Sequence, residues 1–280
     1  VILSGDGLQE VYMYSPGDSR FYILEIRNES SEGVKFTSPI CFDNYRGNKS
    51  VVSEIVLESM EWKLNEDTEF NNDVVLQGNK IDLNGYKLTV NGNLIQEDGE
   101  ININGGELLV KGDYKIESKN GGNSNGSLKM VKEEDYVRVE GNFVTKSLTK
   151  HNGLLTAGTL EIKGNFEQKE VYNGRYTRDN FKATGTHRVI LSGDGLQKVS
   201  FDNPSNSNFA NLVIRNNSSE GVKFATSIGL WVLSEDSIVN SDLLMTGEKI
   251  DLNGHKLTIN GKLIQEDGEI NINGGELLVK

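Results

Sequence analysis

A pattern that returns about every 20 residues constrains this 280-residue chain more than any other feature of its sequence. The pattern is apolar-x-apolar-x-Gly-Asn/Asp. It occurs at residues 88–93, 108–113, 137–142, 160–165 and 189–194, so successive copies begin 20, 29, 23 and 29 residues apart. We interpret the longer spacings as the same unit with loops of three to nine residues inserted.

A longer repeat contains the short one. Residues 1–40 match residues 189–228 at an offset of 188, and residues 83–111 match residues 252–280 at an offset of 169. The change of offset gives the first copy 19 extra residues, which we place at 41–59 because Trp62 then corresponds to Trp231. We expect one continuous repeat structure over residues 1–280, cut from a longer array, with copy one at 1–188 and the start of copy two at 189–280.

Apolar alternation that recurs every 20 residues is what stacked coils of short parallel strands require. Asn and Gly each occur 31 times and Ala only four times, which favours turns over helices. The sequence therefore predicts an all-β fold, a parallel β-helix (β-solenoid) with about 20 residues per coil plus inserted loops. Roughly 13 coils at ~4.8 Å per coil would make a rod of about 60 Å. Tandem antiparallel sandwiches remain the alternative, because Asn-Gly is also a hairpin signal.

Asparagine and glycine mark the expected corners between strands, because Asn tolerates a positive φ and Gly adopts it freely. Asn side chains at equivalent corners could form hydrogen-bonded ladders. Asp113 stands where other coils have Asn142 or Asn165, and this exchange favours a turn residue over a calcium ligand. The predicted corner residues are Asn84, Gly85, Asn91, Gly92, Asn104, Gly105, Gly112, Gly141, Gly164, Gly193, Asn253, Gly254, Asn260 and Gly261.

The run from LTVNGNLIQEDGEININGGELLVKGDYKI through GSLKMVKEEDYVRVEGNF, GLLTAGTLEIKGNFEQK and NFKATGTHRVILSGDGLQKVSF resembles a repeat of large surface or secreted proteins of Gram-positive bacteria. The resemblance covers essentially the whole chain, except that residues 41–59 depart from it. It implies an extracellular, wall-associated scaffold, and it brings no catalytic residues.

No motif in the sequence points to catalysis, a cofactor or a metal, so we expect none of the three. His151, His187 and His255 show no zinc-ligand spacing, and His255 replaces Tyr86 of copy one, which favours a surface histidine. Cys41 is expected to be a small buried apolar residue. A net charge of −12 disfavours nucleic acid as a partner, and no apolar run is long enough for membrane insertion.

The segment VYNGRYTRDN at residues 171–180 is the candidate binding site, because Tyr and Arg are the residue types that stack on sugars or anchor a protein partner. Its candidate binding residues are Tyr172, Arg175, Tyr176 and Arg178. The alternative is a solvated loop over one coil. A second group of aromatic residues, confined to copy one, consists of Tyr12, Tyr14, Tyr22 and Tyr45. Trp62 and Trp231 occur in both copies and are expected to be packing residues.

Three functions follow from these patterns. The first is a non-enzymatic structural segment of an extracellular or cell-surface stalk, fibre or scaffold. Its partners would be neighbouring repeats or other copies joined end to end. The second is an adhesin or carbohydrate-binding module that displays loops to cell-wall or extracellular polysaccharide. The weakest is a polysaccharide lyase or hydrolase, because no acid and base pair recurs in register.

Overall fold

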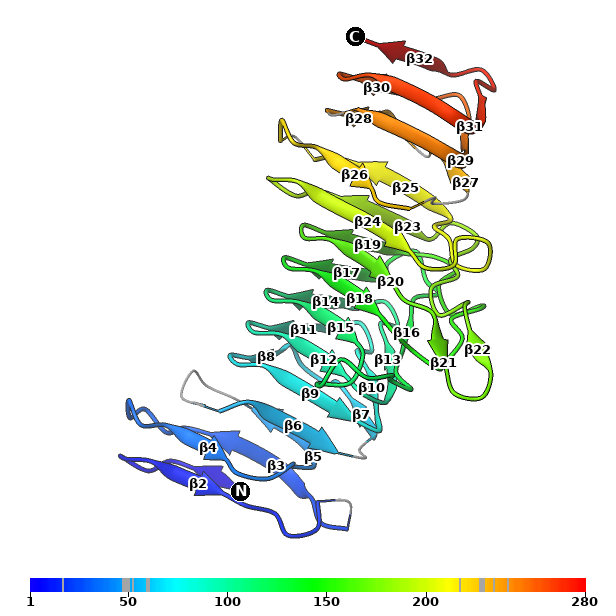
Figure 1. Ribbon diagram of the computed structural model, residues 1–280. Helices are drawn as coiled ribbons and strands as arrows, with labels where there is room; N and C mark the ends of the chain where they lie inside the picture. Colours follow the sequence, from blue (N-terminus) through cyan, green and yellow to red (C-terminus); the bar gives the residue numbers. More distant parts are fainter. Residues whose placement is uncertain are drawn as a thin grey trace.

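The computed structural model describes residues 1–16, 18–46, 51, 53–58, 61–216, 218–226, 230–233, 235–240 and 242–280. Every regular element within these ranges is a β-strand, and the strands pair in parallel except in one short hairpin. About 12 turns, roughly 21 residues apart, stack into an elongated β-solenoid (Figure 1). The predicted fold class is confirmed, and the antiparallel sandwich alternative was wrong.

Three parallel sheets form the sides of the central coils. The eight-stranded sheet consists of β6 (Ile55–Glu58), β9 (Val74–Gln77), β12 (Leu94–Gln96), β15 (Tyr114–Ile116), β18 (Phe143–Thr145), β20 (Phe166–Gln168), β24 (Gln197–Phe201) and β26 (Val222–Phe224). The seven-stranded sheet consists of β8 (Thr68–Phe70), β11 (Lys87–Val90), β14 (Glu107–Val110), β17 (Tyr136–Val139), β19 (Thr159–Ile162), β23 (Arg188–Leu191) and β25 (Asn211–Ile214). The four-stranded sheet consists of β7 (Glu61–Lys63), β10 (Asn79–Asp82), β13 (Gly99–Asn102) and β16 (Ser127–Lys129).

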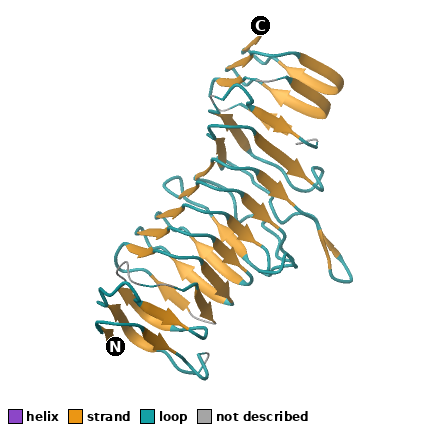
Figure 2. Cartoon of the chain, turned by 60° about the vertical axis from the view of Figure 1, so that its left-hand side comes forward, coloured by secondary structure: helices purple, strands orange, loops and turns teal. Residues whose placement is uncertain are grey.

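Smaller parallel sheets complete the two ends of the stack. The N-terminal coils contain β1 (Ile2–Leu3), β3 (Phe21–Ile26) and β5 (Phe42–Arg46) in one sheet, and β2 (Gln9–Val11) and β4 (Val34–Phe36) in another. The C-terminal coils contain β27 (Leu230–Val232), β29 (Leu243–Asp251) and β31 (Leu263–Asn271), followed on the next side by β28 (Ser237–Val239), β30 (Lys256–Ile259) and β32 (Glu276–Val279). The antiparallel hairpin β21 (Val171–Tyr172) and β22 (Tyr176–Thr177) stands off the side of the rod (Figure 2).

The strand register reproduces the spacing of the short repeat. Leu88 of β11 lies opposite Leu108 of β14, and the same column continues through Val137, Leu160 and Val189. The first residues of all five predicted copies are therefore neighbours along the stack. The extra residues in the longer repeats lie between strands, so they do not shift the register.

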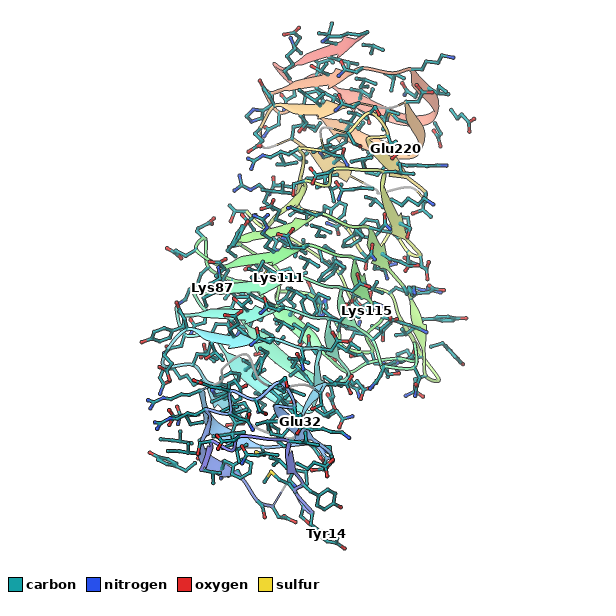
Figure 3. The ribbon with its side chains drawn as sticks, turned by 90° about the vertical axis from the view of Figure 1, so that its left-hand side faces the viewer. Tyr14, Glu32, Lys87, Lys111, Lys115 and Glu220 are labelled. Atoms are coloured by element: carbon teal, nitrogen blue, oxygen red, sulfur yellow. The ribbon has the colours of Figure 1, made fainter. Side chains whose placement is uncertain are left out.

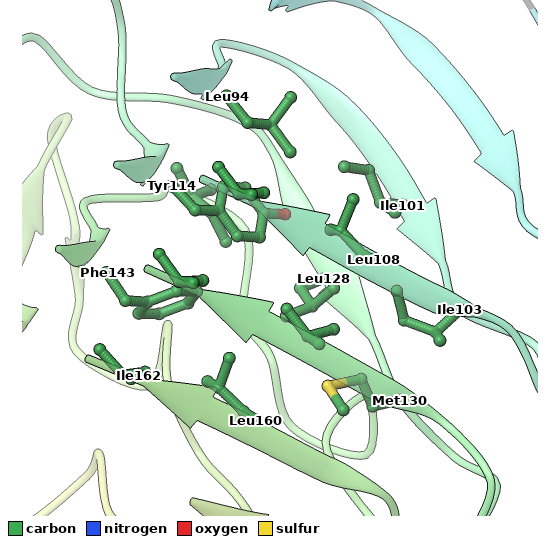
Figure 4. Packing of buried hydrophobic residues seen from close by; sticks show 14 of the residues in the cluster. Leu94, Ile101, Ile103, Leu108, Tyr114, Leu128, Met130, Phe143, Leu160 and Ile162 are labelled. Atoms are coloured by element: carbon green, nitrogen blue, oxygen red, sulfur yellow. The ribbon is translucent and has the colours of Figure 1, made fainter. Parts of the chain in front are cut away.

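Inward-facing residues of successive coils form the core. A single hydrophobic cluster extends from Leu24 to Ile259, so the interior is continuous through most of the rod. Figure 4 shows part of it, including Tyr114 and Phe143, whose ring centroids are 5.4 Å apart in an edge-to-face arrangement. Phe143 in turn stacks on Phe166 at 5.8 Å. Burying each such side chain stabilises the fold by roughly 1.5–3 kcal/mol.

The 41–59 segment supplies two strands, β5 and β6. Phe42 and Tyr45 of β5 are buried, and the Tyr45 ring lies 4.7 Å from that of Phe70. Tyr45 is therefore a core residue and not part of an exposed aromatic group, because its strand packs beneath the next coil. Cys41 is also buried, as predicted, and burial raises the pKa of its thiol.

Deleting residues 41–59 is expected to leave a folded rod that is shorter by about one coil. Copy two passes from β26 to β27 without such a segment, and there Trp231 packs against Phe224 at 6.0 Å. Phe36 is the copy-one equivalent of Phe224, so Trp62 would gain the same neighbour after the deletion. Far-ultraviolet circular dichroism and small-angle scattering of the deletion variant test this. Loss of cooperative unfolding would contradict it.

The outer surface of the rod carries charged side chains, among them Lys87, Lys111 and Lys115 (Figure 3). Lys87 pairs with Glu107 one coil further on, at 2.8 Å, and the equivalent residues of copy two, Lys256 and Glu276, pair at 2.9 Å. Exposed pairs of this kind contribute only about 0–1 kcal/mol each. Their main effect is to keep the outer faces polar between coils.

Candidate functional site: the corner columns and the projecting hairpin

The first predicted corner adopts the expected left-handed backbone. Asn84 and Gly85 have φ angles of 50° and 84°, and Asn104 and Gly105, one coil further on, have 47° and 80°. In copy two, Asn253 and Gly254 repeat this geometry with 45° and 81°. The Asn-Gly pair is needed here because only these residue types adopt two successive positive φ angles at low cost.

The second predicted corner has a different physical basis. Asn91, Gly92, Asn260 and Gly261 do not have a positive φ, so the predicted left-handed bend was wrong for them. Gly92 is instead required by the close approach of successive coils. A Cβ on Gly92 would lie 2.6 Å from the backbone nitrogen of Asp73.

The same close approach continues along the glycine column, which comprises Gly92, Gly112, Gly141, Gly164 and Gly193. The amides of Gly112, Gly141 and Gly164 each donate to the carbonyl of the preceding glycine, at 2.9, 3.0 and 2.9 Å. A Cβ on Gly193 would lie 2.3 Å from the carbonyl oxygen of Lys163. The column therefore joins adjacent coils at a separation that no side chain permits.

A ladder of Asn and Asp side chains runs beside the glycine column. The Asp113 carboxylate accepts hydrogen bonds from the backbone amide and side-chain Nδ2 of Asn142, at 2.8 and 3.0 Å. The Asn93 side chain accepts from the Asp113 amide at 2.9 Å, and the Asn142 side chain accepts from the Asn165 amide at 2.8 Å. The predicted ladder is confirmed, and Asp113 serves it as a turn residue. Among the described residues, no three His, Cys, Asp or Glu side chains are grouped as a metal site would require.

The hairpin β21–β22 brings three of the four candidate binding residues into contact: Tyr172, Tyr176 and Arg178. Tyr172 and Tyr176 face each other across the strand pair, with ring centroids 4.7 Å apart, and they are 60% and 51% exposed. The guanidinium of Arg178 lies 4.6 Å from the centre of the Tyr176 ring. Arg175 is exposed in the turn between the strands. The result is an aromatic and cationic surface on a hairpin that projects from the side of the rod (Figure 2).

A buried polar network that the sequence did not predict holds the base of this hairpin. The side chain of Asn180 donates to the carbonyls of Ser147 and Lys169, at 3.0 and 2.8 Å, and accepts from Nε2 of Gln168 at 2.8 Å. Thr145 donates to the Asn180 carbonyl at 3.1 Å. These residues come from the ends of β18 and β20 and from the segment after β22, so nothing in the local sequence around Asn180 distinguishes it from a loop asparagine.

Replacing Asn180 with alanine is expected to loosen the hairpin, because it leaves buried carbonyls of the network without donors. Such a loss costs about 1–3 kcal/mol. Trypsin cleavage after Arg175 or Arg178 should become faster in the native protein. Asn206→Ala is the control, since that side chain is exposed and its hydrogen bond among the described residues is to the nearby Asn203, at 2.6 Å. Equal cleavage rates in the two variants would contradict the anchoring role.

Two of the three histidines lie inside the fold. His151 and His187 are fully buried, and neither ring nitrogen of either residue has a hydrogen-bond partner among the described residues. Burial lowers the pKa of His151 to about 4, although the backbone of Gly126 and Asn180 beside its ring opposes this shift. Burial alone lowers the pKa of His187 to about 3. His255 is partly exposed, as predicted, with 35% of its side chain accessible.

The remaining aromatic candidates separate into surface and core residues. Tyr12, Tyr14 and Tyr22 are exposed on the N-terminal coils, and Figure 3 shows Tyr14 extending from that end of the rod. Trp62 and Trp231 are buried, as predicted, and the Trp231 indole donates to the carbonyl of Leu212 at 2.8 Å. The exposed tyrosines of the first copy have no stacked partner of the kind that Tyr172 and Tyr176 form, among the described residues.

The chain is thus a β-solenoid. Its outer faces carry ion pairs between coils, its glycine column brings adjacent coils into close contact, and an aromatic hairpin projects from its side. Comparison with protein-family models, curated proteins and solved structures finds no match to it. Within the described residues, no helix has the length and apolarity that a bilayer crossing demands.

Proposed function

We propose that this chain is a non-enzymatic structural segment whose function is to provide length and stiffness. The observation that supports this most is the single hydrophobic core from Leu24 to Ile259, together with the parallel pairing of successive coils within each sheet. In a parallel stack nearly every backbone amide bonds to the next coil, so bending requires many hydrogen bonds to break together. A rod of this kind separates whatever lies at its two ends.

A location outside the cell, as part of a stalk, fibre or surface scaffold, belongs to the same proposal. Its support is the resemblance of the repeat to those of large Gram-positive surface proteins. Stacking onto neighbouring repeats, in the same chain or in another copy, would extend the rod without a new type of contact.

The ion pairs on the polar faces of the rod support a non-enzymatic role. Acidic side chains on the sheets pair with cations of adjacent coils, as Glu107 does with Lys87 and Glu66 with Arg46, at 2.8 and 2.9 Å. Both side chains of each pair therefore connect adjacent coils of the rod. The solenoid fold itself confers no chemistry, so a lyase or hydrolase would need a site of its own.

The rod proposal is tested by electron microscopy and small-angle scattering of this chain and of longer segments of the repeat array. About 12 turns at ~4.8 Å per turn give an expected length of about 58 Å for this chain. Longer segments should grow in length at constant cross-section. Compact particles, or segments that bend freely at the junction between copies, would contradict a spacer function.

Display of a binding element is the second function that a specific observation favours. The hairpin β21–β22 is the one antiparallel pair among the described strands, and it projects from an otherwise regular stack with its tyrosines exposed. Large exposed aromatic side chains that are held in place are typical of recognition sites. A rod that carries such an element would hold it at a fixed distance from its base.

A further inference from the structure

We propose that the hairpin β21–β22 binds an oligosaccharide that ends in a carboxylate sugar. The exposed parts of the Tyr172 and Tyr176 rings would contact the sugar, and the guanidinium of Arg175 would pair with the carboxylate. This inference rests on the second proposed function, display of a binding element, and is independent of whether the rod serves as a stalk.

The aromatic pair of the hairpin is preorganised. The two tyrosines are joined by strand pairing, and their rings touch at 4.7 Å while more than half of each side chain remains exposed. The Asn180 network fixes the base of the hairpin to the rod. A ligand would therefore meet rings that are already placed, and little conformational entropy would be lost on binding.

The hairpin carries two arginines on an otherwise acidic chain. It contains Arg175 and Arg178, and the flanking acids Glu170 and Asp179 are both engaged in ion pairs, although the whole chain has a net charge of −12. Arg178 is committed to Glu170, at 3.1 Å, and to the face of Tyr176. The Arg175 side chain has no hydrogen bond or ion pair with any described residue. A guanidinium exposed in the turn between the two tyrosine-bearing strands is suited to the two oxygens of a carboxylate.

The exposed surface of the hairpin is small. Two tyrosine rings and one guanidinium present far less area than the ~800 Å² per partner of a stable protein interface. The area that these three groups present matches that of one or two sugar rings. A long polyanion is disfavoured because it would also lie along the acidic rod and be repelled by it. A single terminal carboxylate would contact only the hairpin. The electrostatic field of the rod is screened within about 8–10 Å, so it would repel this carboxylate little.

The test is calorimetric titration of the 280-residue chain with three trisaccharides of similar size. One ends in sialic acid, one in a uronic acid and one in a neutral hexose. We expect at least one acidic probe to bind at least tenfold more tightly than the neutral one. Tyr172→Ala and Tyr176→Ala should each weaken that binding at least tenfold, and Arg175→Ala should remove the preference for the acidic probe. Which acidic probe binds identifies the sugar class.

Tyr14→Ala is the matched control, because Tyr14 is 89% exposed elsewhere on the rod and its loss should leave the binding unchanged. The substituted side chains are exposed, so the variants should unfold at the same temperature as the parent, which calorimetric scanning checks. The proposal is overturned if no acidic probe binds, if Arg175→Ala leaves the preference intact, or if the hairpin instead binds an acidic peptide more tightly. Scattering on the same samples reports the rod shape separately, so failure of the stalk function would be recognised independently.

Discussion

Gly164→Ala is expected to destabilise the solenoid by about 3 kcal/mol or more, although it adds only one methyl group. The new Cβ would lie 2.4 Å from both the carbonyl carbon and the carbonyl oxygen of Gly141. Both are backbone atoms, so no side-chain rotation relieves the contact. The coils must separate, which breaks the 2.9 Å bond from the Gly164 amide to the Gly141 carbonyl.

Gly195→Ala is the control for this experiment. Its Cβ would have Glu220 Oε2, at 3.9 Å, as its nearest neighbour, so the free energy of unfolding should change by no more than about 0.5 kcal/mol. Both substitutions restrict the unfolded backbone equally, so their difference isolates the steric cost. Urea unfolding measures it, and hydrogen exchange at the Asn165 amide reports whether the adjacent coils separate. Equal stability of the two variants would refute the close-approach role of the column.

Acidification from about pH 8 to about pH 5 is expected to reduce the free energy of unfolding by about 4 kcal/mol. The pKa values of His151 and His187 are about 4 and about 3 in the folded protein, against an ordinary value of 6.5. The unfolded chain therefore binds protons more tightly. Stability from the two neutral histidines is fully present above about pH 6.5 and decreases as the pH falls towards the folded pKa values, by ~2 kcal/mol per residue at pH 5.

His187→Leu should halve this loss, because only one buried histidine would then remain to be protonated on unfolding. The pH range is chosen because ordinary carboxyl groups have pKa values near 4 and stay ionised above pH 5. Urea unfolding at several pH values gives the free energies. A free energy of unfolding that does not vary over this pH range would contradict the prediction. It would show that the buried imidazole rings can be protonated in the folded protein.

The solenoid coil could be predicted from the sequence because the residue pattern that produces it is local and repeated. Leu88, Leu108 and Val137 recur at one position of the short motif, and the structure places them in one column. The left-handed Asn84-Gly85 corner could also be read directly, since few other residue pairs adopt that backbone. The hairpin residues Tyr172 and Tyr176 were found because they interrupt the repeat with residue types suited to recognition.

The interior polar residues could not be predicted in this way. His151 and Asn180 lie in inserted loops, where the repeat offers no equivalent position for comparison. Tyr45 shares its residue type with the exposed Tyr12 and Tyr14, and burial in β5 alone separates it from them. For Gly92 the sequence identified the right residue for the wrong reason, because it suggested a backbone angle where the constraint is a neighbouring coil.

By itself, the sequence determined the all-β coil, its period and the position of each repeat, because these depend on residue spacing along one chain. Only the tertiary structure decided which glycines touch the preceding coil, which histidines lose their water, and how Asn180 fixes a projecting hairpin. These properties depend on distances between residues that lie a full coil or more apart in the chain, and the amino-acid order does not contain those distances until the coils are stacked.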